Sequence, residues 1–282
     1  MKTVDYLQKV KSKEISVVKT VEKILHEAKN SPNHFTSISK SYALEQAEKI
    51  EKNPQGSLAG LPISVKDGIC VKNIESSAGS EILKDYRPPF SATVINKLEK
   101  EGTIIIGKTS QDEFGFGGFS VNTKKIPKNP YDLTRTCGGS SGGAAGFTAF
   151  TKSPHIALGE STGGSIANPA SFCGVVGLTP TYGLVSRYGL IDYANSLDKI
   201  GTLAKTVSDS FLGLYHIVGY DEKDSTSLSQ KMLHEKKVKK IAVIKESLEV
   251  DKEIKDIILS KLKNYDIISL PSIKRYSLPA YY

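Results

Sequence analysis

The sequence predicts an α/β protein, and three features carry that prediction. Apolar residues recur at helical spacing over residues 17–28, which predicts an amphipathic helix of about four turns. Short apolar runs that fit buried strands alternate with helical segments further along the chain. Lysine-rich segments beyond Asp221 repeat this alternation.

The expected elements follow one another along the whole chain. We predict helices at 17–28, 93–101 and 250–262, and strands at 61–65, 103–107, 156–158, 175–176, 241–244 and 267–270. Residues 115–201 differ from their flanks because they are rich in Gly, Ser and Thr and poor in charge. A flexible linker of that composition would lack the apolar pieces found there, so we expect a packed, glycine-dense core.

Composition excludes several classes of protein. The 282 residues are 39% hydrophobic and carry a formal net charge of +8. The excess lysine is scattered along helical segments without an arginine-rich block, so direct nucleic-acid binding is not predicted. No run approaches the roughly 18 apolar residues that span a membrane, and the N-terminus lacks the apolar centre of a signal peptide. We expect a cytoplasmic protein with no membrane partner.

The cysteines and histidines do not predict a metal site. Cys70, Cys137 and Cys173 are odd in number and far apart, which argues against a disulfide framework and against zinc. In a reducing compartment they fit small buried hydrophobes. The five histidines show no metal-ligand spacing, and a Walker-type phosphate loop is missing. His155, which lies nearest the glycine-rich region, is expected to be structural.

Three segments contain residues that could do chemistry. Lys66 ends an apolar run at 62–66, residues 138–143 read Gly-Gly-Ser-Ser-Gly-Gly, and residues 159–166 contain Thr-Gly-Gly-Ser. Taken alone, the lysine also fits a surface position and the serine-rich loop also fits a plain turn. The loop matches Gly-x-Ser-x-Gly, but the polar, proline-containing residues 129–135 before it do not fit the buried strand of a nucleophile elbow.

The Thr-Gly-Gly-Ser turn suits the binding of a developing negative charge. Gly163 and Gly164 allow the backbone to bend before Ser165, so that successive N–H groups point the same way. An oxyanion needs such donors about 3 Å from the atom on which its charge develops.

Together and in this order, the three segments resemble the amidase signature family. Matching motif to motif, the resemblance implies that Ser165 is the nucleophile, Lys66 the base and Ser140 the bridging serine, preceded by a cis peptide bond. Gly139 and Ser141, on either side of Ser140, would support that loop. The implied fold is a mixed β-sheet sandwiched between α-helices, with the signature core at about 58–205.

The implied chemistry needs no histidine. A lysine acts as a base only when neutral, and burial disfavours its charged form. Lys66 would take a proton from Ser140, which would take one from Ser165. The backbone N–H groups of Thr162, Gly163, Gly164 and Ser165 would hold the oxyanion.

Within this family the chain most resembles the A subunits of tRNA-dependent amidotransferases. The matching segments are 58–62, 107–109, 112–114, 129–132, 169–178, 185–190, 196–201 and 224–227. The resemblance implies that glutamine is hydrolysed through an acyl-serine and that the ammonia passes to a B subunit. That subunit would bind most of the tRNA and use ATP and Mg²⁺ to amidate Glu-tRNA(Gln) or Asp-tRNA(Asn). A C subunit would brace the pair, and this chain would hold no cofactor or metal.

The sequence departs from the family pattern in four places. Ser161, Ala167 and Thr179 stand where relatives usually have Asp, Arg and Lys. If the first two form an ion pair in relatives, Ala167→Arg alone should leave an unpaired charge and destabilise the fold. Relatives also continue beyond Leu278–Tyr282 with an arginine and an aspartate that clamp glutamine. We therefore expect one domain over residues 1–282 that lacks its C-terminal part, which a separate chain would supply.

Two other functions remain open from the residues. One is a stand-alone amidase that acts on small amides. The other is a catalytically inactive assembly subunit, although Lys66, Ser140 and Ser165 are all present.

Overall fold

A computed structural model of the chain describes residues 2–229, 240–262, 264–273 and 275. The chain divides into two compact units, Met1–Lys231 and Met232–Tyr282, and each contains its own β-sheet. The single domain predicted over residues 1–282 stays a prediction. The apolar segment Leu278–Tyr282 lies outside the described residues.

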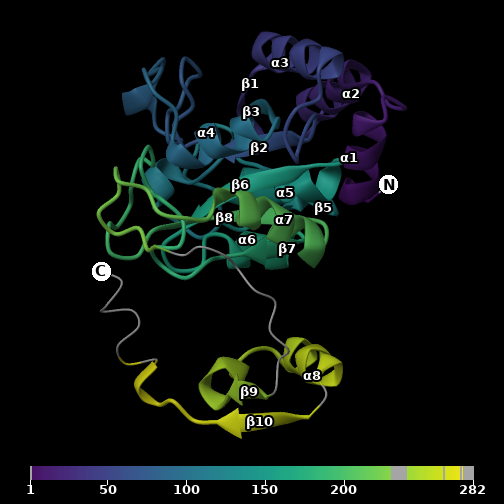
Figure 1. Ribbon diagram of the computed structural model, residues 1–282. Coiled ribbons are helices and arrows are strands. Elements are labelled where there is room, and N and C mark those ends of the chain that lie inside the picture. The colour runs from purple at the N-terminus through teal and green to yellow at the C-terminus, as the bar shows by residue number, and fades with distance from the viewer. Residues whose placement is uncertain (1, 230–239, 263, 274, 276–282) are drawn as a thin grey trace. The chain divides into compact units, whose positions relative to one another are not determined.

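The first unit alternates helices with strands (Figure 1). Its helices are α1 (Thr3–Lys11), α2 (Val17–Lys29), α3 (Lys40–Lys52), η1 (Glu81–Leu83), α4 (Thr93–Lys100), η2 (Glu113–Gly115), α5 (Gly142–Phe150), α6 (Ala167–Phe172) and α7 (Val207–Ile217). Its strands are β1 (Phe35–Ile38), β2 (Pro62–Lys66), β3 (Ile104–Thr109), β4 (Lys128–Asn129), β5 (Asp132–Thr136), β6 (Ile156–Ser161), β7 (Val176–Leu178) and β8 (Lys199–Ala204). Hydroxyl side chains cap two of the α-helices, because Ser16 accepts the Lys19 N–H before α2 and Thr206 accepts the Asp209 N–H before α7.

The central sheet is mixed, with the strand order β1-β3-β2-β6-β8-β7. Strand β2 runs parallel to β3 and β6, whereas β1, β8 and β7 pair antiparallel with their neighbours. Parallel strands end at the same edge of a sheet, so Lys66 at the end of β2 lies beside the end of β6. The sheet therefore brings together two segments that are 94 residues apart in sequence. The predicted mixed α/β fold is confirmed.

Helices cover both faces of this sheet. Ala157 on β6 packs in a core cluster with Ala144 and Ala145 of α5. The preceding residue, Ile156, packs against α7, where a Cβ on Gly213 would lie 3.0 Å from its side chain. Since successive side chains on a strand point to opposite faces, α5 and α7 lie on opposite sides of β6.

The glycine-dense core predicted for residues 115–201 centres on helix α5, whose sequence is GGAAGFTAF. A Cβ at Gly143 would lie 2.4 Å from the His34 carbonyl oxygen, and one at Gly146 would lie 2.6 Å from His34 Nε2. Glycine lowers helix propensity, but here it allows the helix to approach its neighbours more closely than any side chain would permit. The small size of the glycines in α5 thus determines how closely this helix packs against the segment around His34.

The second unit is a short strand–helix–strand arrangement. It comprises β9 (Ile241–Ile244), η3 (Lys245–Leu248), α8 (Lys252–Lys261) and β10 (Tyr265–Ile268). Strands β9 and β10 pair in parallel, as a helical crossover allows. The elements match the predicted types, with the last strand two residues earlier than expected.

The described residues contain no helix long and apolar enough to cross a membrane. The same part of the chain holds no group of three or more His, Cys, Asp or Glu side chains placed for a metal ion. All three cysteines are buried and free, which confirms that they serve as small buried side chains.

Two histidines are buried in the first unit. His34 Nε2 lies 2.9 Å from the Lys128 carbonyl oxygen, and His155 Nε2 lies 2.9 Å from Ser64 Oγ. Burial lowers the pKa of His34 to about 4 and the pKa of His155 to about 3. Both imidazoles are therefore neutral at neutral pH, and His155 has the structural role expected of it.

This burial makes stability sensitive to mild acid. Both pKa values lie below the unfolded value of 6.5, so the unfolded chain binds these protons first as the pH falls. Each histidine should cost up to about 1.4 kcal/mol per pH unit, or about 3 kcal/mol for the two between pH 6.5 and pH 5, because the unfolded imidazoles are already half protonated at pH 6.5. Urea unfolding at a series of pH values should show this loss, and His155→Gln should halve its slope.

The matched control is His26→Gln, which replaces an exposed histidine and should leave the slope as it is. Stability that stays constant from pH 6.5 to pH 5 in the unaltered chain would contradict the argument.

Candidate active site

Lys66 is the central residue of the candidate site. Its side chain is 1% exposed, and its Nζ atom has three acceptors around it. These are Ser140 Oγ at 2.7 Å, Glu160 Oε2 at 2.7 Å and the Glu160 carbonyl oxygen at 3.2 Å. An ammonium group has three protons to donate, so all three are used. The predicted base and the predicted bridging serine are thus in direct contact.

Ser140 is fully buried in the loop between β5 and α5. The peptide bond between Gly139 and Ser140 is cis, as the family resemblance implies. The Ser140 carbonyl oxygen accepts the Asp112 N–H at 3.3 Å and the Ser120 hydroxyl at 3.3 Å. These contacts hold the main chain of the loop while the Ser140 side chain points to Lys66.

Ser165 lies in the turn between β6 and α6 and is 6% exposed. Its carbonyl oxygen accepts the N–H of Ser141 at 3.2 Å. The Thr-Gly-Gly-Ser turn (residues 162–165) and the serine loop (residues 138–143) are therefore joined through their main chains. Gly163 and Gly164 are exposed. No hydrogen-bond acceptor for the N–H groups of these two glycines or Ser165 occurs in the described part of the chain. These groups can therefore meet a substrate oxygen.

Asp112 and Asn168 fix the loops of the site, and neither was predicted to do so from the sequence. The carboxylate of Asp112 accepts the N–H groups of Ser120 at 2.9 Å and Asn122 at 3.2 Å. The Asn168 amide donates to the carbonyl oxygens of Gly118 at 2.6 Å and Gly139 at 3.1 Å. Both side chains bond to main-chain groups, and these hydrogen bonds help the loops to keep their shape.

Glu160 is a residue of the candidate site that sequence reasoning missed. Its side chain is 6% exposed and forms an ion pair with Lys66. Its other oxygen, Oε1, lies 3.0 Å from Thr162 Oγ1, which lies 2.6 Å from Asp198 Oδ1. Burial, more than the nearby Glu160 charge, raises the pKa of Asp198. The only signal in the sequence is one acidic residue in an otherwise uncharged strand.

A second buried lysine lies on the neighbouring strand. Lys108, on β3, donates to Ser76 Oγ at 2.7 Å and to the Asp67 carbonyl oxygen at 2.9 Å. The Asp67 carboxylate is 3.8 Å from its Nζ. Burial lowers the pKa of Lys108 to about 8, although Asp67 opposes that shift. Only Lys66 of these two lysines contacts a candidate serine, which separates their roles.

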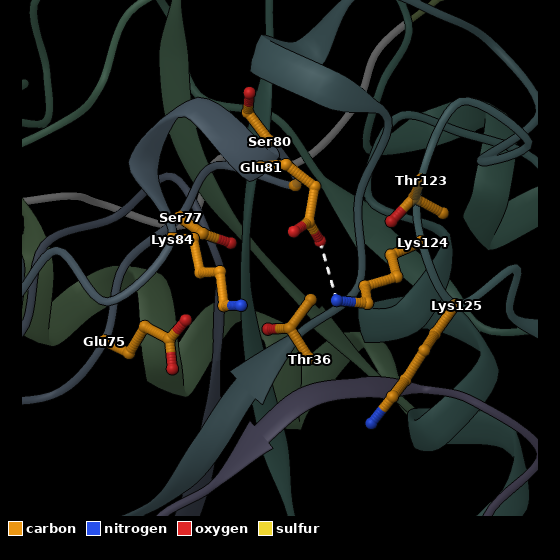
Figure 2. A pocket seen from close by; sticks show the side chains of 10 residues that line it. Thr36, Glu75, Ser77, Ser80, Glu81, Lys84, Thr123, Lys124 and Lys125 are labelled. Atoms are coloured by element: carbon orange, nitrogen blue, oxygen red, sulfur yellow. Dashed lines mark ion pairs between the residues drawn. The ribbon is translucent and has the colours of Figure 1, made fainter.

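A surface pocket lies apart from these residues (Figure 2). It has a volume of about 170 Å³ and is lined by Thr36, Glu75, Ser77, Gly79, Ser80, Glu81, Lys84, Thr123, Lys124 and Lys125. An ion pair of 2.9 Å joins Glu81 to Lys124 across it. It contains neither a nucleophile beside a base nor a candidate residue, so the site is defined by the geometry around Lys66.

The family model named Amidase matches residues 17–266, which is most of the chain. The chain belongs to the amidase family. The resemblance predicted from the three sequence segments is therefore confirmed, and the family match covers all of them.

The curated relatives are amidotransferase subunits. The A subunit of glutamyl-tRNA(Gln) amidotransferase from Methanosarcina mazei is 45% identical, in an alignment that covers 97% of this chain and 61% of the relative. The second A subunit of this enzyme from Clostridium acetobutylicum is 46% identical, and the alignment covers 90% of this chain and 58% of the relative. This chain thus spans less than two thirds of the length of these relatives.

Solved structures show the same fold. The A subunit of glutamyl-tRNA(Gln) amidotransferase from Thermotoga maritima has a TM-score of 0.76 at 34% identity, over 94% of this chain and 59% of that one. The native peptide amidase of Stenotrophomonas maltophilia has a TM-score of 0.84 at 25% identity, over 99% and 64%.

The structure changes the expectation for the departures from the family pattern. Ala167 is exposed, so an arginine there can reach water and Ala167→Arg alone should not destabilise the fold. The exposure of Ala167 argues against the destabilisation predicted from the sequence, and that effect stays a prediction. Ser161 is buried, and its hydroxyl has no partner among the described residues. Thr179 is half-buried, and nothing in the structure explains the departure there.

Close packing around Gly139 predicts that an alanine at this position destabilises the fold. A Cβ at Gly139 would lie 2.4 Å from Asp112 Oδ2 and 2.7 Å from the main-chain nitrogens of Phe119 and Ser120. Gly139→Ala should therefore cost about 2 kcal/mol or more in the free energy of unfolding, measured in urea.

The matched control is Gly118→Ala, because a Cβ there would meet only Asn168 Nδ2, at 3.8 Å. That variant should stay within about 0.5 kcal/mol of the unaltered chain. Equal stability of the two variants would show that the loop relaxes around the new methyl group.

Proposed function

We propose that this chain is the glutaminase subunit of a tRNA-dependent amidotransferase. The observation that carries the proposal is the contact between Lys66 Nζ and Ser140 Oγ at 2.7 Å, beside a turn that holds Ser165. The relatives named as amidotransferase A subunits support the choice of substrate, because they are 42–46% identical over most of the chain.

The proposed reaction is acyl transfer from an amide to a serine. Ser165 Oγ attacks the side-chain carbonyl carbon of glutamine as its proton passes to Ser140, and Ser140 passes its own proton to Lys66. The carbonyl π electrons move to oxygen, and the N–H groups of Gly163, Gly164 and Ser165, with that of Thr162, donate to the oxyanion. Lys66 then returns the proton through Ser140 to the amide nitrogen, the carbon–nitrogen bond breaks as the carbonyl re-forms, ammonia leaves, and an ester remains on Ser165. Water then releases glutamate.

The relatives are named as subunits of an amidotransferase, which supports a heteromeric complex. The individual partners proposed are those that the family resemblance implies. Ammonia would pass to a B subunit that uses ATP and Mg²⁺ to amidate Glu-tRNA(Gln) or Asp-tRNA(Asn) and makes most of the tRNA contacts. A C subunit would complete the assembly in the cytoplasm. This chain would hold no cofactor of its own.

A stand-alone amidase is the second candidate function. The peptide amidase of Stenotrophomonas maltophilia has the same fold at a TM-score of 0.84, so the arrangement also suits chemistry on small amides without transfer to tRNA. An assembly subunit without activity is the remaining alternative.

Ammonia release from glutamine tests the proposal. The tagged chain, purified with the native partners that accompany it, should release ammonia, and misacylated tRNA with ATP should stimulate that release. Ser165→Ala should lower the rate by at least about a thousandfold, because it removes the nucleophile. The control is Ser171→Ala, which changes an exposed serine on the adjoining helix α6.

Each of the other outcomes favours a different function. Ammonia release that survives Ser165→Ala would contradict the proposed mechanism. Release from other amides but not from glutamine would support the stand-alone amidase. No release in the presence of bound partners would support an assembly role.

A further inference from the structure

The contacts of Lys66 present a difficulty for its role as a base. Its three acceptors, two of them on Glu160, fill the valence of an ammonium group. In that state Lys66 donates to Ser140 and cannot accept a proton from it. Before the proposed reaction can start, Lys66 must lose one proton. Among its three contacting atoms, the one that readily holds a proton is Glu160 Oε2, at 2.7 Å.

The other oxygen of Glu160 leads to a second carboxyl group. Thr162 Oγ1 lies 3.0 Å from Glu160 Oε1 and 2.6 Å from Asp198 Oδ1. A hydroxyl has one proton, so it can donate to only one of these oxygens. Hydrogen bonds on both sides therefore require a proton on one of the two carboxyl groups.

The surroundings assign that proton to Asp198. Its Oδ2 atom accepts the N–H groups of Tyr193 and Ala194 at 2.8 and 2.9 Å, which leaves Oδ1 to donate to Thr162. The raised pKa of Asp198, caused mainly by burial, agrees with this. Glu160 has the ammonium of Lys66 beside it and so holds the negative charge.

We propose that Glu160 takes a proton from Lys66 and thereby converts it into the neutral base, while Asp198 keeps its own proton and positions Glu160 through Thr162. In this step the Nζ–H bond breaks, its electron pair stays on nitrogen, and an O–H bond forms at Oε2. Rotation about the Cε–Nζ bond then turns this electron pair toward Ser140 Oγ, so that Ser140 can donate to it. The two charges cancel, and no proton leaves the site. Glu160 is a positioning residue that acts through Lys66. The inference rests on the proposed function only for the roles of Lys66, Ser140 and Ser165.

This arrangement has a consequence for pH dependence. Since the proton moves within the pair, the reactivity of Ser165 should not require the release of a proton to solvent. Without the carboxylate, Lys66 must lose its proton to water before it can act. The other titratable groups near Glu160 are Lys199, which donates to the Thr162 carbonyl oxygen at 3.1 Å, and Tyr193, whose ring packs on Phe116. Both are left unchanged in the test.

The test measures sulfonylation of Ser165 by phenylmethanesulfonyl fluoride. Ser165 Oγ bonds to sulfur and fluoride leaves, so neither glutamine nor a partner is needed, and intact-protein mass spectrometry gives the rate at each pH. The unaltered chain should react at rates within about threefold between pH 6.5 and pH 9, and Ser165→Ala should not react. Glu160→Gln should react at a rate that rises about tenfold per pH unit, as expected when one proton must first be lost.

Asp198→Asn is the matched variant because asparagine has the shape of a protonated aspartate and can donate to Thr162 in the same way. It should keep the flat profile of the unaltered chain. Glu160→Asp keeps a carboxylate and should also keep a flat profile, at a lower rate. Thermal unfolding of each variant checks that it is folded.

Several results would overturn the inference. One is a sulfonylation rate that already rises tenfold per pH unit in the unaltered chain. This result would overturn the inference even if none of the variants folds. A Glu160→Gln profile parallel to that of the unaltered chain would reduce Glu160 to a structural role. The absence of any sulfonylation at Ser165 would also refute it. These results are separate from the ammonia assay, since the predicted profiles without ammonia release would contradict only the glutaminase proposal.

Discussion

A buried ammonium group is the constraint on which the rest of this site depends. An unpaired charge in a protein interior costs many kcal/mol, and a buried pair is stable only when its geometry and hydrogen bonds are nearly complete. Lys66 meets this condition with three acceptors within 3.2 Å. Those acceptors come from the serine loop and from β6, so the charge holds together the elements that carry the chemistry. Loss of the Glu160 carboxylate would leave the Lys66 ammonium group buried without a counterion, so its effect would extend beyond the single lost contact.

The main chain around Ser140 is shaped by small and polar residues more than by apolar packing. Asp112 and Asn168 bond to main-chain groups on either side of the loop, and the glycines beside it leave room for these contacts. Helix α5 begins directly after the loop and approaches the sheet closely because it carries glycine and alanine. Rigidity in this region therefore comes from hydrogen bonds and close backbone approach, which keep reacting groups in place.

The two compact units differ in what they contribute. All of the candidate residues, the supporting side chains and the mixed sheet belong to the first unit. The match to the amidase family extends from residue 17 to residue 266 and so includes strand β9 and helix α8 of the second unit. The candidate residues thus lie in the first unit alone, whereas the family match extends into the second unit.

The sequence by itself predicted the type of nine of the elements, three helices and six strands, and it pointed to Lys66, Ser140 and Ser165. Periodicity identified helix α2, because an apolar pattern reports which face of a helix is buried, and a continuous apolar run identified the strand that ends at Lys66. The motifs around Ser140 and Ser165 were visible because their glycines lie close together in sequence. Only the tertiary structure decided that Glu160 faces Lys66, because that contact depends on β2 and β6 being neighbours in the sheet. Strand order and long-range charge pairing arise from packing between distant segments, which local sequence patterns do not encode.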